Sequence, residues 1–401
     1  MHSEIIKTMK KISFAAQYVI TNTSEPIKNG VVSLDASTGE IIEVKQLTRE
    51  IPYTEFYNGV LIPGFVNAHC HLELCHLKDK VKNPKSLIDF LLAMFRLDAN
   101  SYDEKLTLKY DSLMYSSGVS AVGDICNTSD TAKVKAKSRI HYKNFVELIG
   151  TTPERCQKDI LQFENVKNDY LSFGIDANDI SAVPHAPYSV SPELFSIINR
   201  LNENRKEIIS IHNQENFNEN FLYENHSGEF VERFPLDLSL IPITGKTSLQ
   251  SMKELCEGGY ERTLLVHNIY SSKEDLEFAA KNFKNPFFVV CPKSNIFLEN
   301  KIIDVNVLLE RNLTVCIGTD SLSSNNNLSM IEELIVLSKK FENLKLEDLI
   351  KFATLNGAKA LGLEAKLGSF EKGKSPGVVL LENVDLHNFR LTDKTLSRRL
   401  I

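Results

Sequence analysis

Five of the ten histidines in this 401-residue chain stand where predicted strands end. The first two, His69 and His71, close the apolar stretch LIPGFVNAHCH, and residues two apart on a strand project to the same side. Two imidazoles held at a fixed separation form half of a metal-binding site. The other polar groups at strand ends are His185, His212, His267 and Asp320. Their gathering at one rim predicts a metal centre there.

A metal centre of this composition would be rich in nitrogen. Two histidines from one strand, a third from another strand and an aspartate suit Zn²⁺ or a similar divalent transition ion, and they leave one position open for water. Because the metal lowers the pKa of that water, hydroxide becomes available near neutral pH. We therefore predict a hydrolase with one divalent metal ion, Zn²⁺ before Fe²⁺, Mn²⁺ or Ni²⁺.

Further polar residues near these strand ends are candidates for catalysis or substrate binding. Glu215 lies three residues after His212, where its carboxyl group could move a proton between the water and a substrate nitrogen. His267 could orient the water or polarise the bond under attack. The alternatives are a solvated loop acid and a structural histidine. Candidate pocket residues, which could equally have packing, capping or turn roles, are His185, Asn295 and Ser324.

These residues need a scaffold that brings several strand ends together. From Leu61 to about Leu363, short apolar strands alternate with amphipathic segments that carry helix-capping signals, such as Ser272 with Asp275. Strands that alternate with helices in this way predict a (β/α)8 barrel, whose active groups lie at the carboxyl ends of the strands. The eight predicted strands are 61–68, 119–125, 144–149, 180–184, 207–211, 263–266, 286–290 and 313–317.

The segments on either side of the barrel also contain predicted strands. The later segment is too short to fold alone. We therefore predict a small β-sandwich domain built from residues 1–60 and 364–401, next to a barrel domain of residues 61–363. The strands expected in the small domain are 11–21, 30–34, 40–44 and 378–381.

The connection from Asn213 to about Glu261 is long for a compact domain, and it follows a strand that ends in histidine. It is rich in Asn, Glu and aromatic residues. Long irregular connections are usually lids or binding loops. We expect this one to help select the substrate, with a surface insertion as the alternative.

Composition limits the classes of partner. A net charge of -6 and a pI near 6.0 give no reason to expect nucleic acid or an anionic membrane as a partner. Seven scattered cysteines without a CxxC pair indicate free thiols in a reducing compartment, and no apolar run approaches the length of a membrane span. We therefore expect a cytoplasmic enzyme with a small-molecule substrate, for which a homodimer is one candidate assembly.

Seven short motifs together resemble the amidohydrolase superfamily, in its branch of metal-dependent deaminases and chlorohydrolases. They are PGFVNAHCH at 63–71, PHAPYS at 184–189, HNQE at 212–215, VHN at 266–268, CPKSN at 291–295, GTDSLSSN at 318–325 and ATLNGAKALGL at 353–363. The resemblance implies a (β/α)8 barrel. It also implies metal ligands at His69, His71, His212 and Asp320, with proton transfer by Glu215, His267 and Asp320. One departure is the C-terminal TLSRRLI, which stands where the family has a final strand and turn.

Within this branch the sequence is most similar to the aminofutalosine deaminases of menaquinone biosynthesis. The similarity lies in HCHLEL, HAPYSV, CPKSN and TDSLSSN, and it makes Glu73 a candidate contact for ribose or another polar substituent. The implied reaction is hydrolytic release of ammonia from an adenine-type ring, with aminodeoxyfutalosine as the first candidate substrate. The alternatives are another purine or nucleoside, such as S-adenosylhomocysteine, methylthioadenosine or guanine, and a chlorohydrolase or cyclic amidohydrolase. A non-catalytic scaffold would be expected to lack a ligand, and here the set is complete.

Overall fold

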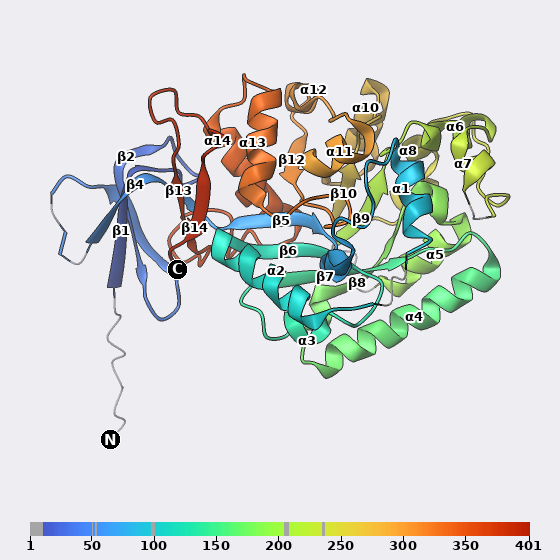
Figure 1. The fold of residues 1–401 in the computed structure, drawn as a ribbon, viewed down its shortest axis with the longest axis horizontal. Helices are drawn as coiled ribbons and strands as arrows, with labels where there is room; N and C mark the ends of the chain where they lie inside the picture. Colours follow the sequence, from blue (N-terminus) through green and yellow to red (C-terminus); the bar gives the residue numbers. More distant parts are fainter. Residues whose placement is uncertain (1–10, 50, 53, 98–100, 204–207, 235–236) are drawn as a thin grey trace.

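Among the residues that the computed structural model describes, the strands form three sheets, two of them parallel with four strands each and one mixed with six (Figure 1). In Figure 1 the six-stranded sheet lies at one end of the molecule and the parallel strands lie beside it, surrounded by helices. The structure describes residues 11–49, 51–52, 54–97, 101–203, 208–234 and 237–401.

The two parallel sheets close into the predicted barrel. One runs β5-β6-β7-β8 and the other β12-β11-β10-β9. At one seam the backbone N–H of His212 donates to the carbonyl of His185, and at the other Thr319 N–H donates to the carbonyl of His69, both at 3.0 Å. The expectation of a (β/α)8 barrel is confirmed. Its strands are β5 (Phe65–Cys70), β6 (Val119–Cys126), β7 (His141–Leu148), β8 (Ile180–Pro184), β9 (Ile208–Asn213), β10 (Arg262–His267), β11 (Pro286–Val290) and β12 (Thr314–Ile317).

Apart from β7, which begins at the exposed residue His141, the barrel strands are buried along almost their whole length, because both faces of a parallel sheet are covered. The covering helices begin where local capping predicts. The Ser272 hydroxyl accepts from Asp275 N–H and the Asp275 carboxylate accepts from Ser272 N–H, which is the capping box expected from the sequence. The helices are α1 (Leu87–Met94), α2 (Glu104–Ser117), α3 (Ala132–Lys135), α4 (Pro153–Ser172), α5 (Pro192–Leu201), α10 (Lys273–Asn282), α11 (Pro292–Glu299), α12 (Val305–Glu310), α13 (Met330–Lys340), α14 (Leu346–Lys351) and α15 (Gly357–Ala360).

The six-stranded sheet draws on both ends of the chain. Its strand order is β14-β13-β4-β1-β2-β3, so the C-terminal strands join the N-terminal ones through β4. Where the sequence predicted a small β-sandwich, the hydrogen bonds form one continuous sheet with its own apolar cluster, which includes Phe14, Leu34 and Phe370. The proposed division into two domains stays a prediction. The strands are β1 (Lys11–Val19), β2 (Ile27–Asp35), β3 (Ile41–Gln46), β4 (Thr54–Pro63), β13 (Val378–Glu382) and β14 (Leu396–Arg399).

The run predicted as one strand over 61–68 is divided between two sheets. β4 ends at Pro63 and pairs with β13, whereas β5 begins at Phe65 and pairs with β6. Gly64 stands at the crossing, where a Cβ atom would lie 2.0 Å from the Ser120 hydroxyl oxygen and 2.3 Å from the Pro376 carbonyl oxygen. Only glycine fits this close approach.

Two further strand predictions need comment. The segment TLSRRLI was expected to replace the final strand, but Leu396–Arg399 forms β14, which pairs antiparallel with β13. That expectation was wrong because β14 is a polar edge strand, whose alternating exposed residues carry little hydrophobic signal. The strand predicted at 207–211 is β9, and its first predicted residue, Glu207, lies outside the described residues.

The long connection after β9 contains short helices that dock next to the barrel rim. Tyr188 stacks on Phe230 with ring centroids 4.3 Å apart, and the Tyr223 hydroxyl donates to the Pro187 carbonyl at 2.8 Å. Phe230 and Tyr223 are buried in one apolar cluster with residues of α1. The connection therefore packs beside the PHAPYS segment. Its helices are α6 (Asn218–Asn225), α7 (Glu229–Arg233), α8 (Ser248–Ser251) and α9 (Lys253–Glu257).

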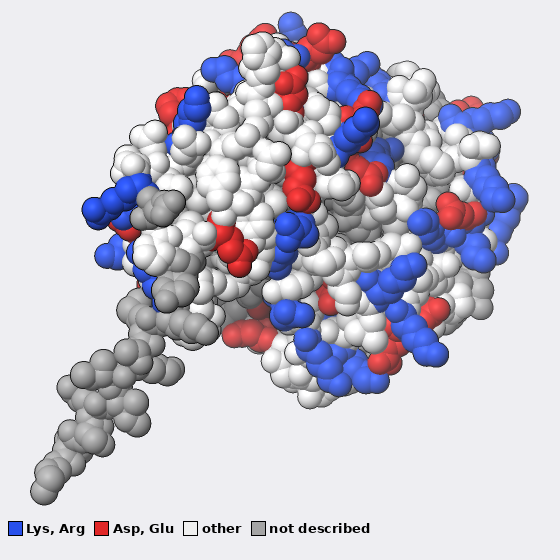
Figure 2. Space-filling view, turned by 60° about the vertical axis from the view of Figure 1, so that its left-hand side comes forward, with Lys and Arg blue, Asp and Glu red and all other residues white. Residues whose placement is uncertain are grey.

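The surface carries charges of both signs. On the face drawn in Figure 2, acidic and basic side chains lie interspersed among uncharged residues. Among the helices of the described residues, none combines the length and the apolar character needed to cross a lipid bilayer.

Candidate metal centre and active site

The backbone of the barrel rim brings the predicted ligands together from three strands. His69 and His71 lie at and just after the end of β5, and His212 lies near the end of β9. The carbonyl oxygen of His69 accepts two hydrogen bonds, from Thr319 N–H at 3.0 Å and from Asp320 N–H at 3.1 Å. These bonds fix the segment after β12 directly against β5, so the last predicted ligand meets the first.

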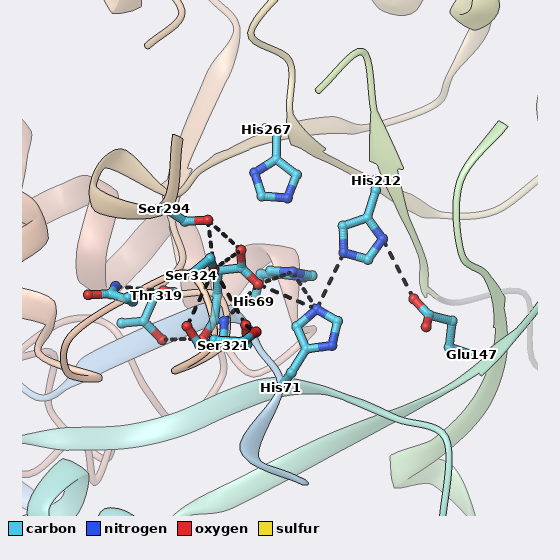
Figure 3. A network of polar contacts seen from close by, with 12 residues as sticks. His69, His71, Glu147, His212, His267, Ser294, Thr319, Ser321 and Ser324 are labelled. Carbon is cyan, nitrogen blue, oxygen red and sulfur yellow. Dashed lines mark hydrogen bonds and ion pairs between the residues drawn. The ribbon is translucent and has the colours of Figure 1, made fainter. Parts of the chain in front are cut away.

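The ligand atoms of these residues converge. The Nε2 atom of His71 lies 3.1 Å from Nε2 of His69 and 3.3 Å from Nε2 of His212. Asp320 Oδ1 is 3.7 Å from His69 Nε2 and 3.5 Å from His71 Nε2. All four side chains are buried. Figure 3 shows the three imidazoles directed at a common point.

This donor set fits a divalent cation. The His212 Nδ1 atom lies 2.8 Å from the His185 carbonyl oxygen, which only accepts, so Nδ1 carries the proton and Nε2 presents a lone pair. Burial, followed by the neighbouring His69, lowers the pKa of His71 to about 3, which keeps that ring neutral. Lone pairs that face each other at these distances repel unless a cation lies between them. Neutral imidazoles and a carboxylate are the ligands that transition ions take.

The Asp320 carboxylate is held by a cluster of serines. Oδ2 accepts from the Ser294 hydroxyl at 2.5 Å and from the Ser324 hydroxyl at 2.8 Å, and Oδ1 accepts from Ser321 N–H at 2.7 Å. Burial acts to raise the pKa of Asp320, but the neighbouring histidine rings lower it well below its ordinary value. The carboxylate is therefore ionised and fixed in direction. Ser324 touches this predicted ligand (Figure 3), and its expected contact with substrate stays a prediction.

Glu215 and His267 face each other beside the ligands. Glu215 Oε1 lies 3.4 Å from His267 Nε2, and both side chains are almost fully buried. Ligand atoms of Glu215, His267 and Asp320 all lie within 4.8 Å of one another. Burial raises the pKa of Glu215 well above its ordinary value, and the nearby Asp320 charge raises it further. A protonated carboxyl group here can donate a proton at neutral pH.

A strained turn aims Glu215 at the site. Gln214 follows β9 with φ 45°, a left-handed conformation that is unusual for a residue with a side chain. The Glu219 carboxylate holds this turn, because it accepts from the backbone N–H groups of Gln214, Glu215 and Asn216 at 2.9, 2.8 and 3.3 Å. His267 and Asp320 also have positive φ, 74° and 58°. Strain of this kind persists where surrounding bonds fix the backbone.

The remaining predicted residues surround this core. Asn295 Oδ1 lies 2.8 Å from His267 Nδ1 and so orients that ring. His185 Nδ1 lies 2.6 Å from the Ser189 hydroxyl, and its ring lies 5.0 Å from that of His212. Glu73 is buried next to the rim. The structure thus brings together all the predicted ligands and catalytic candidates, and places the four predicted substrate contacts around them.

Three residues of the site were missed by the sequence analysis. Glu147 is the penultimate residue of β7. A search for carboxyl groups near strand ends, like the one made for histidines, would have selected it. Ser294 lies within the CPKSN motif, from which only Asn295 was chosen. Glu219 lies in the first turn of α6, inside the long connection after β9, where the sequence gives no sign that its carboxylate binds three backbone N–H groups.

Comparison with known proteins identifies the family of the chain. A model described as "Amidohydrolase family" matches residues 60–396. The chain belongs to the amidohydrolase family. As a member it is a hydrolase that acts on carbon–nitrogen bonds other than peptide bonds, which confirms the reaction class expected from the sequence.

Individual relatives extend over most of the chain. The chain is 28% identical over 383 residues to an adenosine deaminase of Helicobacter pylori, covering 88% of each protein. It is 28% identical over 377 residues to a 5-methylthioadenosine/S-adenosylhomocysteine deaminase of Caldicellulosiruptor saccharolyticus, covering 90% of this chain and 80% of the relative. A crystal structure of Helicobacter pylori aminofutalosine deaminase in complex with methylthio-coformycin superposes with a TM-score of 0.77 at 25% identity, covering 92% of each chain.

Proposed function

We propose that this protein is a metal-dependent hydrolytic deaminase of an adenine nucleoside. The proposal rests mainly on two sets of buried residues that lie side by side at the rim of the barrel. Three imidazole nitrogens and the Asp320 carboxylate form a cation site, and the Glu215–His267 pair lies beside it. The relatives named above, whose names refer to adenosine, 5-methylthioadenosine and S-adenosylhomocysteine, support the adenine ring as the group attacked.

His69, His71, His212 and Asp320 would hold the metal, for which Zn²⁺ is the first candidate. When bound, a divalent ion makes water more acidic and polarises the bond under attack. The chain's own residues then handle the protons. The ionised Asp320 carboxylate would accept a proton from the attacking water, and the Glu215 carboxyl group would donate one to a ring nitrogen. Asp320 would then pass its proton to the amino group, and Glu215 would recover one from the added hydroxyl as the carbon–nitrogen bond breaks and ammonia leaves.

His267 and Asn295 position the reacting groups. The Asn295 contact fixes the tilt of the His267 ring, and His267 Nε2 then faces Glu215 and the cation site. Because Nδ1 of this neutral ring donates to the Asn295 amide oxygen, Nε2 presents a lone pair that can accept a hydrogen bond from the attacking water and so orient it. Because the site is buried, these interactions are stronger than they would be in water.

Among adenine nucleosides, aminodeoxyfutalosine is the first candidate substrate, because the motifs around the site resemble those of that deaminase group. The direct test is ammonia release by the metal-loaded protein from aminodeoxyfutalosine, adenosine, methylthioadenosine, S-adenosylhomocysteine, adenine and guanine. We expect turnover of at least one nucleoside. Metal-loaded protein that releases ammonia from none of them would contradict the proposed function.

The role of Glu215 has a separate test. Glu215→Gln keeps the size of the side chain but cannot donate a carboxyl proton, so we expect kcat to fall by about 10²- to 10⁴-fold while the metal content stays the same. Glu232→Gln, a change at an exposed glutamate of α7, is the matched control and should retain full activity. Full activity of the Glu215 variant would refute its role in proton transfer.

A further inference from the structure

One buried carboxyl group at the rim has no part in the mechanism above. Glu147 is the penultimate residue of β7, and its side chain is 4% exposed. Its Oε2 atom accepts a hydrogen bond from the Asn127 side-chain amide at 3.1 Å, but Oε1 has no hydrogen-bond partner among the described residues. An unpaired buried acceptor is costly, so a group of this kind calls for a ligand.

The nearest protein donor does not satisfy this oxygen. His212 Nδ1 lies 3.6 Å from Glu147 Oε1, beyond hydrogen-bond distance, and the proton on Nδ1 is directed at the His185 carbonyl at 2.8 Å. Figure 3 shows Glu147 on the far side of His212 from the serine cluster. The free oxygen therefore lies beside the metal centre without belonging to its ligand set.

Glu147 also lines a cavity of about 290 Å³. Glu73 lines the same cavity, but its carboxylate oxygens accept from Asn127 N–H at 2.9 Å and from Thr128 N–H at 3.1 Å. Glu73 thus holds the turn after β6. Buried polar atoms without a hydrogen-bond partner remain on four lining residues, His76, Tyr102, Glu147 and Asp159, and of these Glu147 is the one that lies beside the metal ligand His212. The volume lies just below the range of about 300–1,000 Å³ usual for whole-ligand pockets, so it suits part of a substrate.

We propose that Glu147 determines substrate specificity by binding a hydroxyl group on the sugar of the nucleoside. This inference rests on the proposed function, which puts the adenine ring at the metal centre and leaves its substituent to the adjoining cavity. The cavity disfavours an anionic substituent, because it contains several carboxyl groups and its one arginine, Arg155, is already paired with Asp159 at 3.0 Å. A sugar hydroxyl donates one hydrogen bond to Oε1 and brings no charge.

The experiment compares kcat and KM for adenosine, 2′-deoxyadenosine and 3′-deoxyadenosine. Glu147→Leu removes the acceptor, and Glu147→Gln retains the shape if the leucine variant does not fold. We expect Glu147→Leu to raise KM for adenosine by about 10- to 100-fold, the usual cost of leaving a buried hydroxyl without its hydrogen-bond partner. For the deoxynucleoside that lacks the partner hydroxyl, the variant and the wild-type protein should agree within about threefold, because the missing contact is already lost.

The control is Asp130→Asn, a change at an exposed carboxylate on the wall of the same cavity, which should alter KM little for any of the three nucleosides. Equal losses of kcat/KM for all three nucleosides in the Glu147 variants, or loss of bound metal, would overturn the proposal and show that Glu147 acts through His212. Wild-type protein that binds metal but deaminates none of the three, while it deaminates a base without sugar, would instead refute the proposed function.

Discussion

The buried ion pair between Lys135 and Asp124 beneath the active site gives a sharp prediction about stability. Lys135 Nζ lies 2.5 Å from Asp124 Oδ2, and the two side chains are 1% and 0% exposed. Lys135 Nζ also donates to the Tyr170 hydroxyl at 3.1 Å. Burial acts to lower the pKa of Lys135, but the adjacent Asp124 charge opposes this and the resulting pKa lies well above its ordinary value. The lysine is therefore charged.

Lys135→Met removes the charge and keeps an apolar side chain of similar length. Asp124 would then be a buried carboxylate without its partner, a loss that typically costs about 3–5 kcal/mol. We expect the free energy of unfolding to fall by that amount. Lys133→Met is the matched control on the same helix, because Lys133 pairs with Glu104 at the surface and such pairs contribute less than about 1 kcal/mol.

The double variant Lys135→Met with Asp124→Asn tests the mechanism. Asparagine retains an acceptor for Leu72 N–H, which now donates to Asp124 Oδ1 at 2.9 Å, but carries no unpaired charge. We expect it to be more stable than Lys135→Met alone by at least about 1 kcal/mol. The assay is urea unfolding of the metal-loaded proteins followed by circular dichroism, since the chain has no tryptophan. A Lys135→Met protein within 1 kcal/mol of wild type, or a double variant no more stable than the single one, would refute the reasoning.

Two further predictions concern other buried groups of the rim. Glu333 accepts from Lys293 N–H and from the Asn325 amide, and burial raises its pKa from 4.5 to about 8, so the folded protein holds a proton that the unfolded chain releases. Its contribution to stability is therefore present below pH 4.5 and is lost as pH rises to about 8. Relative to Glu333→Gln, the free energy of unfolding of the wild-type protein should fall by up to ~4 kcal/mol between pH 5 and pH 8. Free energies of unfolding that change in parallel with pH in the two proteins would contradict this prediction. A Cβ atom on Gly318 would lie 2.8 Å from His69 Cβ and 2.9 Å from Cys291 Sγ, so Gly318→Ala should displace His69. We expect the free energy of unfolding to fall by about 1–3 kcal/mol and the metal to bind more weakly in a competition titration. Unchanged metal affinity would show that the site tolerates the displacement of His69.

The ligand set was accessible to sequence analysis because its geometry follows from strand ends. His69, His71, His212 and Asp320 each lie at or just after the carboxyl end of a barrel strand, and a closed parallel barrel brings such positions to one rim. The apolar strands themselves were evident from composition, and β8 and β11 have the predicted bounds. All of these positions follow from the course of the backbone in a parallel barrel, which can be predicted without knowing how the side chains pack.

The errors have a different physical origin. The run from Leu61 to Val66 is apolar throughout, and its division at Gly64 depends on the atoms of Ser120 and Pro376, which are distant in sequence. β14 is a strand because β13 offers it hydrogen bonds. The contact of Ser324 with Asp320 was likewise not foreseen, because it depends on the turn after β12, which directs the hydroxyl inward. Long-range contacts decided each of these cases, and a local pattern does not contain them.

The two amide hydrogen bonds that join Thr319 and Asp320 to the His69 carbonyl have a consequence for how the protein matures. The fourth ligand reaches the site only when the last barrel strand has docked against the first, so a chain still emerging from the ribosome presents three imidazoles without their carboxylate. An ion that prefers the finished site adds its binding energy to the closed ring alone. A metal ion held by all four of these residues would therefore favour the closed barrel and slow reopening of the seam between β5 and β12.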